Sequence, residues 1–194
     1  MEYKSQKNVA GVDEVGRGSL IGPVYAATVV FKKGFDKKKV KDSKKLSPKK
    51  REFLENYIKK NSYWAIGTAS MKEIEKINIL NASLLAMKRS ILKLKFKPKI
   101  VKVDGNKKPN INNLNIKSVV RGDQKIPEIS AASILAKVSR DRLIKKMSKK
   151  FKAYLWDRNV GYGTKDHLSA IKKFGITKHH RKTFKPIHNI LSPK

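Results

Sequence analysis

The chain contains, near its start, the segment Asp13-Glu14-Val15-Gly16-Arg17-Gly18-Ser19-Leu20-Ile21-Gly22-Pro23-Val24. It follows a short apolar run that begins at Asn8, and it leads into residues 22–31, which are rich in Val, Ala, Thr and Tyr. Branched and aromatic side chains favour strands, whereas glycine favours turns and loops. The stretch therefore predicts a strand, a glycine loop and a second strand, with two carboxylates where the first strand ends.

Further helices and strands are predicted downstream. Ser47 and Pro48 start a helix that runs to about Lys60, with four apolar residues on a core-facing side: Phe53, Leu54, Tyr57 and Ile58. Residues 62–70 predict a strand, and a long helix from Met71 to about Phe96 has a break near Asn78 or Asn81.

The second half of the chain alternates strands with helices. Strands are predicted at 99–103, delivering Asp104 to a turn, and at 116–121, ending at Gly122-Asp123. Helices are predicted from Pro127 to about Phe151 and from the cap Thr164 to Gly175, and the basic stretch 177–194 is expected to be loosely ordered. Its 194 residues suit one domain, 1–194, with a mixed sheet covered by helices.

The composition is ordinary for a globular protein except for its charge. Lys and Arg number 47 against 15 Asp and Glu, a formal net charge of +32, which attracts polyanions such as nucleic acid. The alternative is that Lys is simply the default surface residue of this chain. Cysteine is absent, which excludes disulfides and thiolate chemistry. Neither a signal peptide nor a 20-residue apolar span is found, so a cytoplasmic protein without a membrane partner is expected.

Four of the few acidic residues occupy informative positions: Asp13, Glu14, Asp104 and Asp123 all lie at predicted strand ends or beside glycines. Rigid strand ends allow carboxylates to converge, and carboxylate oxygens suit hard cations such as Mg²⁺ or Mn²⁺. Two such ions can activate water and stabilise a leaving oxygen in phosphodiester hydrolysis. Taken alone, an Asp-Glu pair is also typical of an ordinary surface.

The loop Gly16-Arg17-Gly18 does not fit a dinucleotide-binding loop. The third glycine, Gly22, comes one residue late, and a strand follows where that motif has a helix. No serine-nucleophile elbow or P-loop is present either. The four histidines lack partner acids at metal-ligand spacing, so solvated positions or phosphate contacts are expected for them: His167, His179, His180 and His188.

The segment quoted first resembles the signature of ribonuclease HII, the bacterial type 2 ribonuclease H. The stretches 42–46, 103–105, 122–123, 131–141, 161–164 and 180–184 match later motifs of that family in order, so the resemblance covers nearly the whole chain. It implies an α/β, ribonuclease H-like fold with a mixed five-stranded sheet, a core of about 8–150 and a helical, substrate-contacting part of about 151–194.

The resemblance also implies the chemistry. Asp13, Glu14, Asp104 and Asp123 would be the catalytic, metal-binding carboxylates for two Mn²⁺ or Mg²⁺ ions. The enzyme would cut the RNA strand of RNA/DNA hybrids and nick duplex DNA 5′ to an embedded ribonucleotide. It would leave 5′-phosphate and 3′-hydroxyl ends and serve ribonucleotide excision repair.

Substrate contacts are implied for a further set of residues. The family would recognise the junction of a ribonucleotide with DNA through Gly16, Arg17, Gly18 and Tyr162, and phosphates through Ser43, Lys44 and Lys45. Backbone groups of a glycine loop can reach a 2′-hydroxyl, and an aromatic ring can stack on a sugar or base. Weaker candidates are Ser133, Lys137 and Arg140, although a local salt bridge between Arg140 and Asp141 is an equal alternative.

Three departures from the family pattern concern the geometry of the glycine loop and its surroundings. Ser19 stands where proline is common, Ile21 where a small residue is usual, and Pro127-Glu128 precede the alanine-rich helix in an unfamiliar way. They put in doubt how strictly the junction is recognised. None of them removes a proposed metal ligand.

Two alternative functions are also compatible with the sequence. A noncatalytic basic nucleic-acid-binding protein would explain the charge but not the acids beside glycine, and a nuclease of the same fold acting on DNA alone would not need a 2′-hydroxyl. The related ribonuclease HIII carries an N-terminal domain, for which no room is expected before Asp13. A monomer is expected, with a sliding clamp as a further partner that the apolar tail residues Ile187, Ile190 and Leu191 could bind.

Overall fold

A five-stranded mixed sheet forms the centre of the fold. The computed structural model describes residues 8–40 and 46–192. The strands lie in the order β3-β2-β1-β4-β5, with β1–β2 and β2–β3 antiparallel and β1–β4 and β4–β5 parallel. Their bounds are β1 Val9–Val15, β2 Val24–Phe31, β3 Ser62–Ala69, β4 Ile100–Asp104 and β5 Ile116–Val119. The predicted fold class is confirmed.

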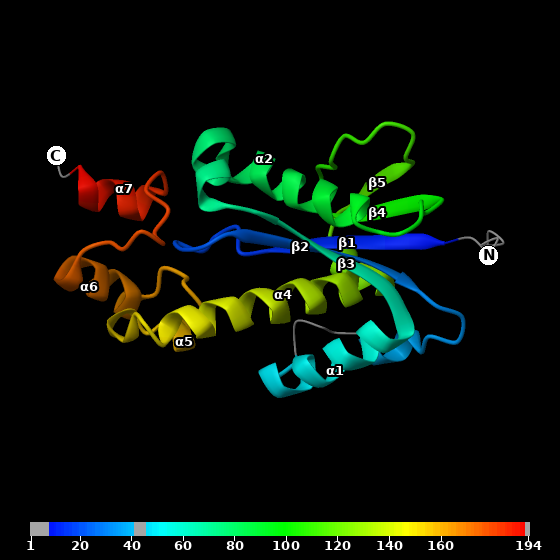
Figure 1. Cartoon of the computed structure of the whole chain (residues 1–194), viewed down its shortest axis with the longest axis horizontal. Helices are drawn as coiled ribbons and strands as arrows, with labels where there is room; N and C mark the ends of the chain where they lie inside the picture. The colour runs from blue at the N-terminus through cyan, green and yellow to red at the C-terminus, as the bar shows by residue number, and fades with distance from the viewer. Residues whose placement is uncertain (1–7, 41–45, 193–194) are drawn as a thin grey trace.

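Helices cover both faces of this sheet (Figure 1). One face packs on α2, Met71–Leu92, and the other on α1, Pro48–Asn61, and α4, Pro127–Ser148. The shorter helices are η1 Lys37–Val40, α3 Gly122–Lys125, η3 Lys152–Tyr154, α5 Trp156–Asn159, α6 Lys165–Phe174 and α7 Lys185–Leu191. The last three gather beyond one end of the sheet, where they share a third core with Leu20, Ile21 and Ile144.

Capping residues explain where several helices begin. The Ser47 hydroxyl accepts a hydrogen bond from the Lys50 amide, with Pro48 as the first helical residue. Ser70 and Glu73 form a capping box at the start of α2, each side chain bonded to the backbone of the other. Asn78 has φ 63° inside α2, which confirms a break at that residue.

Gly11 allows α4 to lie directly on β1. A Cβ atom at this position would lie 2.1 Å from the backbone carbon of Glu128, closer than any side chain can approach. The face of β1 turned toward α4 therefore has no side chain at residue 11, and the next residue on that face is Asp13. This contact fixes the height of α4 above the end of β1.

Several predictions about the elements were wrong. Phe53 is 71% exposed, because the buried face of α1 runs through Leu54 and Ile58, a turn of about 100° away. The strand predicted at 116–121 ends at Val119, so Asp123, which follows Gly122, lies in the first turn of the short helix α3. The basic stretch after Thr177 is ordered up to residue 192, because α7 buries Ile187 completely in the third core.

No helix within the described part of the chain combines the length and apolar character needed to cross a membrane.

Candidate active site

Three of the predicted carboxylates lie together where β1 and β4 end. The parallel register pairs Val12 with Val103, and continuing it by one residue sets Asp13 beside Asp104. Because side chains alternate along a strand, Asp13 faces α4 and Glu14 faces α2. Asp104 influences the ionisation of both neighbours, so its carboxylate lies close to each of them. The fold therefore brings these three acids to the same end of the sheet.

The fourth acid is tied to the cluster through the backbone of α3. The amide of Gly122 donates a 2.6 Å hydrogen bond to Oδ1 of Asp104, and Asp123 follows directly. A Cβ atom on Gly122 would lie 2.6 Å from Ile129, so glycine allows α3 to approach α4 here. Asp123 is buried, with 5% of its surface exposed. The segment that carries Asp123 is thus fastened to the Asp104 side chain.

Burial and crowding of negative charge disfavour ionisation in this cluster. Burial, and next the carboxylate of Glu14, raise the pKa of Asp13 well above its usual value, although a hydrogen bond from Ser133 of α4 opposes this. Burial also raises the pKa of Glu14, against the opposing charge of Arg17. Carboxylates whose charges repel one another in a buried place are stabilised by a cation between them.

The residue types fit a hard divalent cation, but the side chains are not closed around one. Among the described residues, no three Asp, Glu or His groups converge in ligand geometry. A cavity of about 80 Å³ adjoins the cluster and is lined by Glu14, Asp104, Asn106 and residues of α2. Carboxylate oxygens of this kind bind Mg²⁺ and Mn²⁺.

The glycine loop is joined to the loop that carries Tyr162. The amide of Leu20 donates to the carbonyl of Gly161 at 2.8 Å, and Ser19 and Tyr162 form an isolated antiparallel bridge. The Tyr162 ring lies 3.8 Å from where a Cβ atom on Gly18 would stand. Tyr162 and the loop 16–18, which were predicted to act together, are therefore neighbours.

The other predicted substrate contacts are the side chains of Arg17, Lys137 and residues 43–45. Arg17 pairs with Glu14 at 3.3 Å and is otherwise open to solvent. Lys137 bonds Asp141 at 2.9 Å, and its ammonium group lies 5.8 Å from the centre of the Tyr162 ring. The predicted phosphate contacts Ser43, Lys44 and Lys45 lie outside the described residues.

Two of the histidines are core residues, so the prediction of solvated positions was wrong for them. His167 and His180 are 0% and 1% exposed, whereas His188 is exposed. Nε2 of His167 accepts from the Trp156 indole at 2.9 Å, so its Nδ1–H donates to the carbonyl of Tyr162 at 2.9 Å. Burial, and next the charge of His167, lower the pKa of His180 to about 4. The pair is therefore neutral and supports the Tyr162 loop.

Two buried arginines also differ from the sequence prediction. Arg140 does not pair with Asp141 but bonds Ser19 and backbone carbonyls, and Arg181 bonds carbonyls of the glycine loop. The sequence places Arg181 in the motif at 180–184 and predicts no role for it. Among 47 Lys and Arg residues, nothing in the sequence marks these two as buried.

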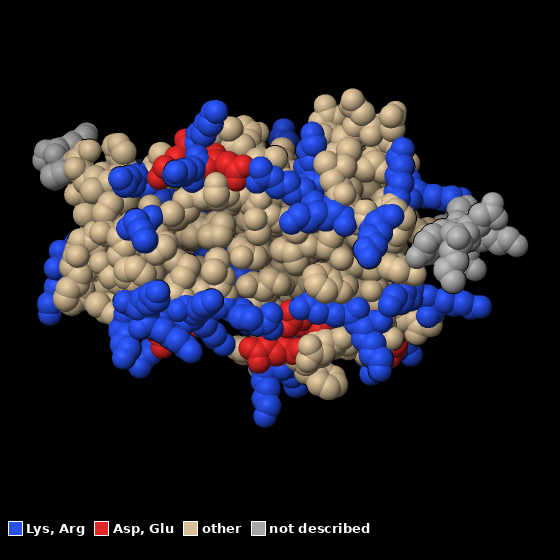
Figure 2. Space-filling view, viewed as in Figure 1, with Lys and Arg blue, Asp and Glu red and all other residues tan. Residues whose placement is uncertain are grey.

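Basic residues dominate the outer surface. Figure 2 shows Lys and Arg spread in bands along the visible face, with acidic residues gathered at only a few places. Two acidic residues of the chain pair with arginines, in the ion pairs Glu73–Arg89 and Glu55–Arg142, both at 2.6 Å. A surface of this kind is suited to long-range attraction of a nucleic acid.

Comparisons with known proteins agree with one another. The family model for Ribonuclease HII matches residues 10–187. A protein of Pelagibacter ubique strain HTCC1062 named Ribonuclease HII is 69% identical over 185 residues, covering 95% of this chain and 100% of that one. The structure of ribonuclease H2 from Pyrococcus horikoshii OT3 has a TM-score of 0.78 at 28% identity, covering 94% of this chain and 96% of that one. A chain of the PCNA:RNase HII complex from Archaeoglobus fulgidus has a TM-score of 0.79 at 27% identity, covering 96% and 98%.

Proposed function

The chain belongs to the ribonuclease HII family, and we propose that it hydrolyses the RNA strand of RNA/DNA hybrids and nicks duplex DNA 5′ to an embedded ribonucleotide. As a ribonuclease H it is an endonuclease that hydrolyses phosphodiester bonds. The observation that supports this substrate is the carboxylate cluster at the ends of β1 and β4. The glycine loop follows β1 directly and is joined to Tyr162 by the bridge with Ser19. Products with 5′-phosphate and 3′-hydroxyl ends would suit the removal of ribonucleotides from DNA.

The four carboxylates are the proposed ligands of two divalent ions, Mn²⁺ or Mg²⁺. Asp13 and Asp104 come from adjacent parallel strands and are proposed to be shared, with Glu14 and Asp123 completing the two sites. Bound divalent ions supply an activated water for in-line attack and neutralise charge on the leaving oxygen. Because burial and neighbouring negative charge disfavour ionisation of Asp13 and Glu14, a bound cation and these two carboxylates would stabilise each other.

Residues behind the carboxylates orient them. Ser133 bonds the carboxylate of Asp13 from α4, and the Gly122 amide bonds that of Asp104 from α3. Partners of this kind fix the orientation of a ligand and contribute to metal affinity. Arg17, paired with Glu14 and half exposed, is placed to exchange that carboxylate for a phosphate of the substrate.

Recognition of the ribose is proposed to come from the glycine loop and Tyr162. Gly18 is exposed and has no side chain, so its backbone amide is open to a 2′-hydroxyl, the group that distinguishes RNA from DNA. The Tyr162 ring is half-buried beside Gly18 and could stack on a sugar or base. The helical part after residue 151 would then contact the duplex, together with the lysines of 43–45.

Cleavage of three labelled duplexes tests this proposal. One carries a single ribonucleotide in DNA, one is an RNA/DNA hybrid and one is all DNA, each incubated with Mn²⁺, Mg²⁺ or chelator. The proposal predicts metal-dependent cutting of the first two, a nick 5′ to the ribonucleotide and no cut in the third. Cutting of the all-DNA duplex would favour a DNA nuclease of the same fold, and binding without cutting would favour a noncatalytic protein.

Metal titration of single variants tests the division of ligands. Isothermal titration with Mn²⁺ should show weaker binding for each of Asp13→Ala, Glu14→Ala, Asp104→Ala and Asp123→Ala than for the unchanged chain. Unaltered affinity in any of them would remove that residue from the proposed set. Asp157→Ala is a suitable control, because Asp157 is an exposed acid on α5.

Binding to a sliding clamp is a further proposal for the C-terminal residues. The Archaeoglobus fulgidus protein was solved in a complex with PCNA. Of the three apolar residues considered, Ile187 is fully buried and is therefore unsuited to anchor a partner. Leu191 is 46% exposed and Ile190 is half-buried, so a contact would have to use these two. Loss of clamp binding in Leu191→Asp, measured by gel filtration, would support this, and unchanged binding would contradict it.

A further inference from the structure

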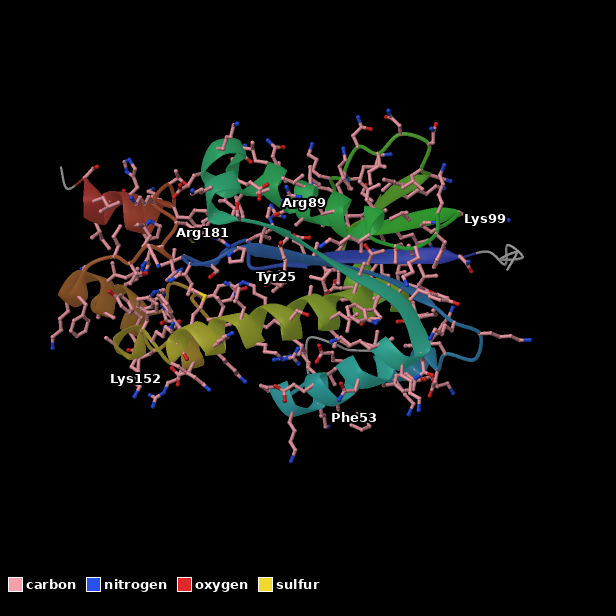
Figure 3. The ribbon with its side chains drawn as sticks, viewed as in Figure 1. Tyr25, Phe53, Arg89, Lys99, Lys152 and Arg181 are labelled. Atoms are coloured by element: carbon pink, nitrogen blue, oxygen red, sulfur yellow. The ribbon has the colours of Figure 1, made fainter. Side chains whose placement is uncertain are left out.

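Two arginines from distant parts of the chain are completely buried under the glycine loop. Arg140 comes from the second half of α4 and Arg181 from the segment between α6 and α7, and both are 0% exposed. Figure 3 shows Arg181 between the end of the sheet and the C-terminal helices. Both side chains bond carbonyls of residues 17–22, and the charge of Arg140 acts on Arg181, so the two guanidinium groups lie near each other.

Arg181 holds both ends of the loop. Its Nη1 donates to the carbonyl of Arg17 at 3.0 Å, and its Nε donates to the carbonyl of Gly22 at 2.9 Å. Its own amide donates to the carbonyl of Leu20 at 2.8 Å. A single residue therefore accounts for three carbonyl contacts across the loop.

Arg140 holds the middle of the loop and joins it to the Tyr162 segment. Its Nη2 donates to the hydroxyl of Ser19 at 2.6 Å and to the carbonyl of Ile21 at 3.3 Å, and its Nη1 donates to the carbonyl of Val160 at 3.1 Å. A Cβ atom at Gly16 would lie 2.3 Å from Nε of Arg140. The first glycine of the loop is thus needed for the arginine to pass beneath it.

Burial of these two cations lowers the stability of the folded chain. Within residues 8–40 and 46–192, neither arginine forms an ion pair with a carboxylate, and Nε of Arg140 and Nη2 of Arg181 have no hydrogen-bond partner. Burial, and next repulsion from Arg140, lower the pKa of Arg181 to about 9. Buried, uncompensated cations destabilise a fold, so their presence at one place indicates a role in function.

The contacts determine which way the loop peptides face. In a trans peptide the C=O of one residue and the N–H of the next point in opposite directions. Because the carbonyl of Arg17 points inward to Arg181, the N–H of Gly18 points outward, away from the protein. Gly18 is exposed, and its amide makes no hydrogen bond within the described chain. The arginines therefore present a free donor beside the Tyr162 ring.

We infer that Arg140 and Arg181 are positioning residues that hold the glycine loop, with the Gly18 amide outward and Tyr162 beside it, in the shape that selects a ribonucleotide. They act through the loop and do not touch the substrate, and the inference rests on the proposed function. Their fork of donors is essential, because one planar guanidinium reaches several carbonyls whose positions an ammonium group cannot satisfy together.

Arg140→Lys and Arg181→Lys keep the charge and remove the fork, and Arg142→Lys is a matched control. Arg142 lies two residues from Arg140 on α4, but its side chain is 60% exposed and pairs with Glu55. With Mn²⁺ present, the KM for a duplex with one ribonucleotide is compared with the inhibition constant of an all-DNA duplex used as competitor. The ratio of the two constants measures preference for the ribonucleotide. A milder variant, Ser19→Ala, removes one acceptor of Arg140 with both charges retained.

The preference should fall at least fivefold in Arg140→Lys and Arg181→Lys and by a smaller factor in Ser19→Ala. The inhibition constant of the all-DNA duplex should stay within about twofold, and Arg142→Lys should match the unchanged chain. Partial unfolding would lower the active fraction and hence the apparent kcat, leaving the ratio as it was. An unaltered ratio in all three variants would overturn the inference, whereas absence of any cleavage by the unchanged chain would instead overturn the proposed function.

Discussion

Acidification should destabilise this fold through the buried histidine pair. His180 is 1% exposed, its Nδ1 accepts a 2.8 Å hydrogen bond from the Thr177 amide, and its Nε2 lies 3.3 Å from Nε2 of His167. Burial is the main cause that lowers its pKa from 6.5 to about 4. The unfolded chain therefore binds a proton at a pH where the folded chain does not, so stability is lost as the pH falls below 6.5.

The size of the effect follows from the two pKa values. Taking 6.5 for the unfolded chain and about 4 for the folded chain, the free energy of unfolding should be lower at pH 5 than at pH 7 by about 2 kcal/mol. Burial also lowers the pKa of His167, which adds a change of the same sign. Asp13 and Glu14 act in the opposite direction, because their raised pKa values favour the folded chain at low pH.

Urea unfolding at both pH values, followed by circular dichroism, measures the effect. His180→Asn removes the titration and can still place an amide oxygen where Nδ1 accepts from Thr177, and His188→Asn is the control on an exposed histidine. The difference between pH 7 and pH 5 should shrink by about 2 kcal/mol in His180→Asn and by nothing in His188→Asn. An equal pH dependence in all three chains would show that protonation of His180 does not destabilise the fold.

Three further substitutions give separate checks. Gly11→Ala should lower the free energy of unfolding by at least about 2–3 kcal/mol, because the new Cβ would meet the backbone of α4; a smaller loss in urea unfolding would show that α4 can move away. Ser133→Ala should weaken Mn²⁺ binding about tenfold in calorimetry by releasing Asp13, with Ser139→Ala as the control on the same helix, and equal affinities would contradict the role of Ser133. Tyr162→Ala should raise the KM for a duplex with one ribonucleotide about tenfold, as expected for a lost stacking contact; an unchanged KM would exclude the ring from substrate binding.

Much of the fold can be predicted from the sequence, because the strands and long helices follow local patterns. Ser47-Pro48 and Ser70 mark the starts of two helices, and both caps are observed. A break was predicted near Asn78 or Asn81, and the structure has it at Asn78, whose φ is 63°. Phe53 shows the limit of such patterns: its spacing fits the apolar face of α1, but the tertiary packing of that helix leaves it in solvent.

The position of the carboxylates in the candidate site could also be predicted, because it follows from the strands. Asp13, Glu14 and Asp104 sit at strand ends, and neighbouring strand ends converge, so their proximity follows from topology. The burial of His167 and His180 and of the two arginines depends on tertiary contacts. The contact between Arg140 and Ser19, for example, joins residues more than a hundred positions apart. No local pattern records such contacts, and in so basic a chain a buried arginine looks like any other.

Single-turnover cleavage of a duplex with one ribonucleotide is the decisive experiment, with the unchanged chain compared with Asp104→Asn and with the control Asp157→Asn. In Mn²⁺ or Mg²⁺, the unchanged chain and the control should produce one nick 5′ to the ribonucleotide, leaving a 3′-hydroxyl and a 5′-phosphate, and chelator should abolish it. Asp104→Asn should still bind the duplex but cut it at least a hundredfold more slowly. The reason is that the Asp104 carboxylate, a proposed metal ligand, lies beside Asp13 and is bonded to the Gly122 amide of α3. Equal cleavage by Asp104→Asn, or a nick that persists in chelator, would contradict the account.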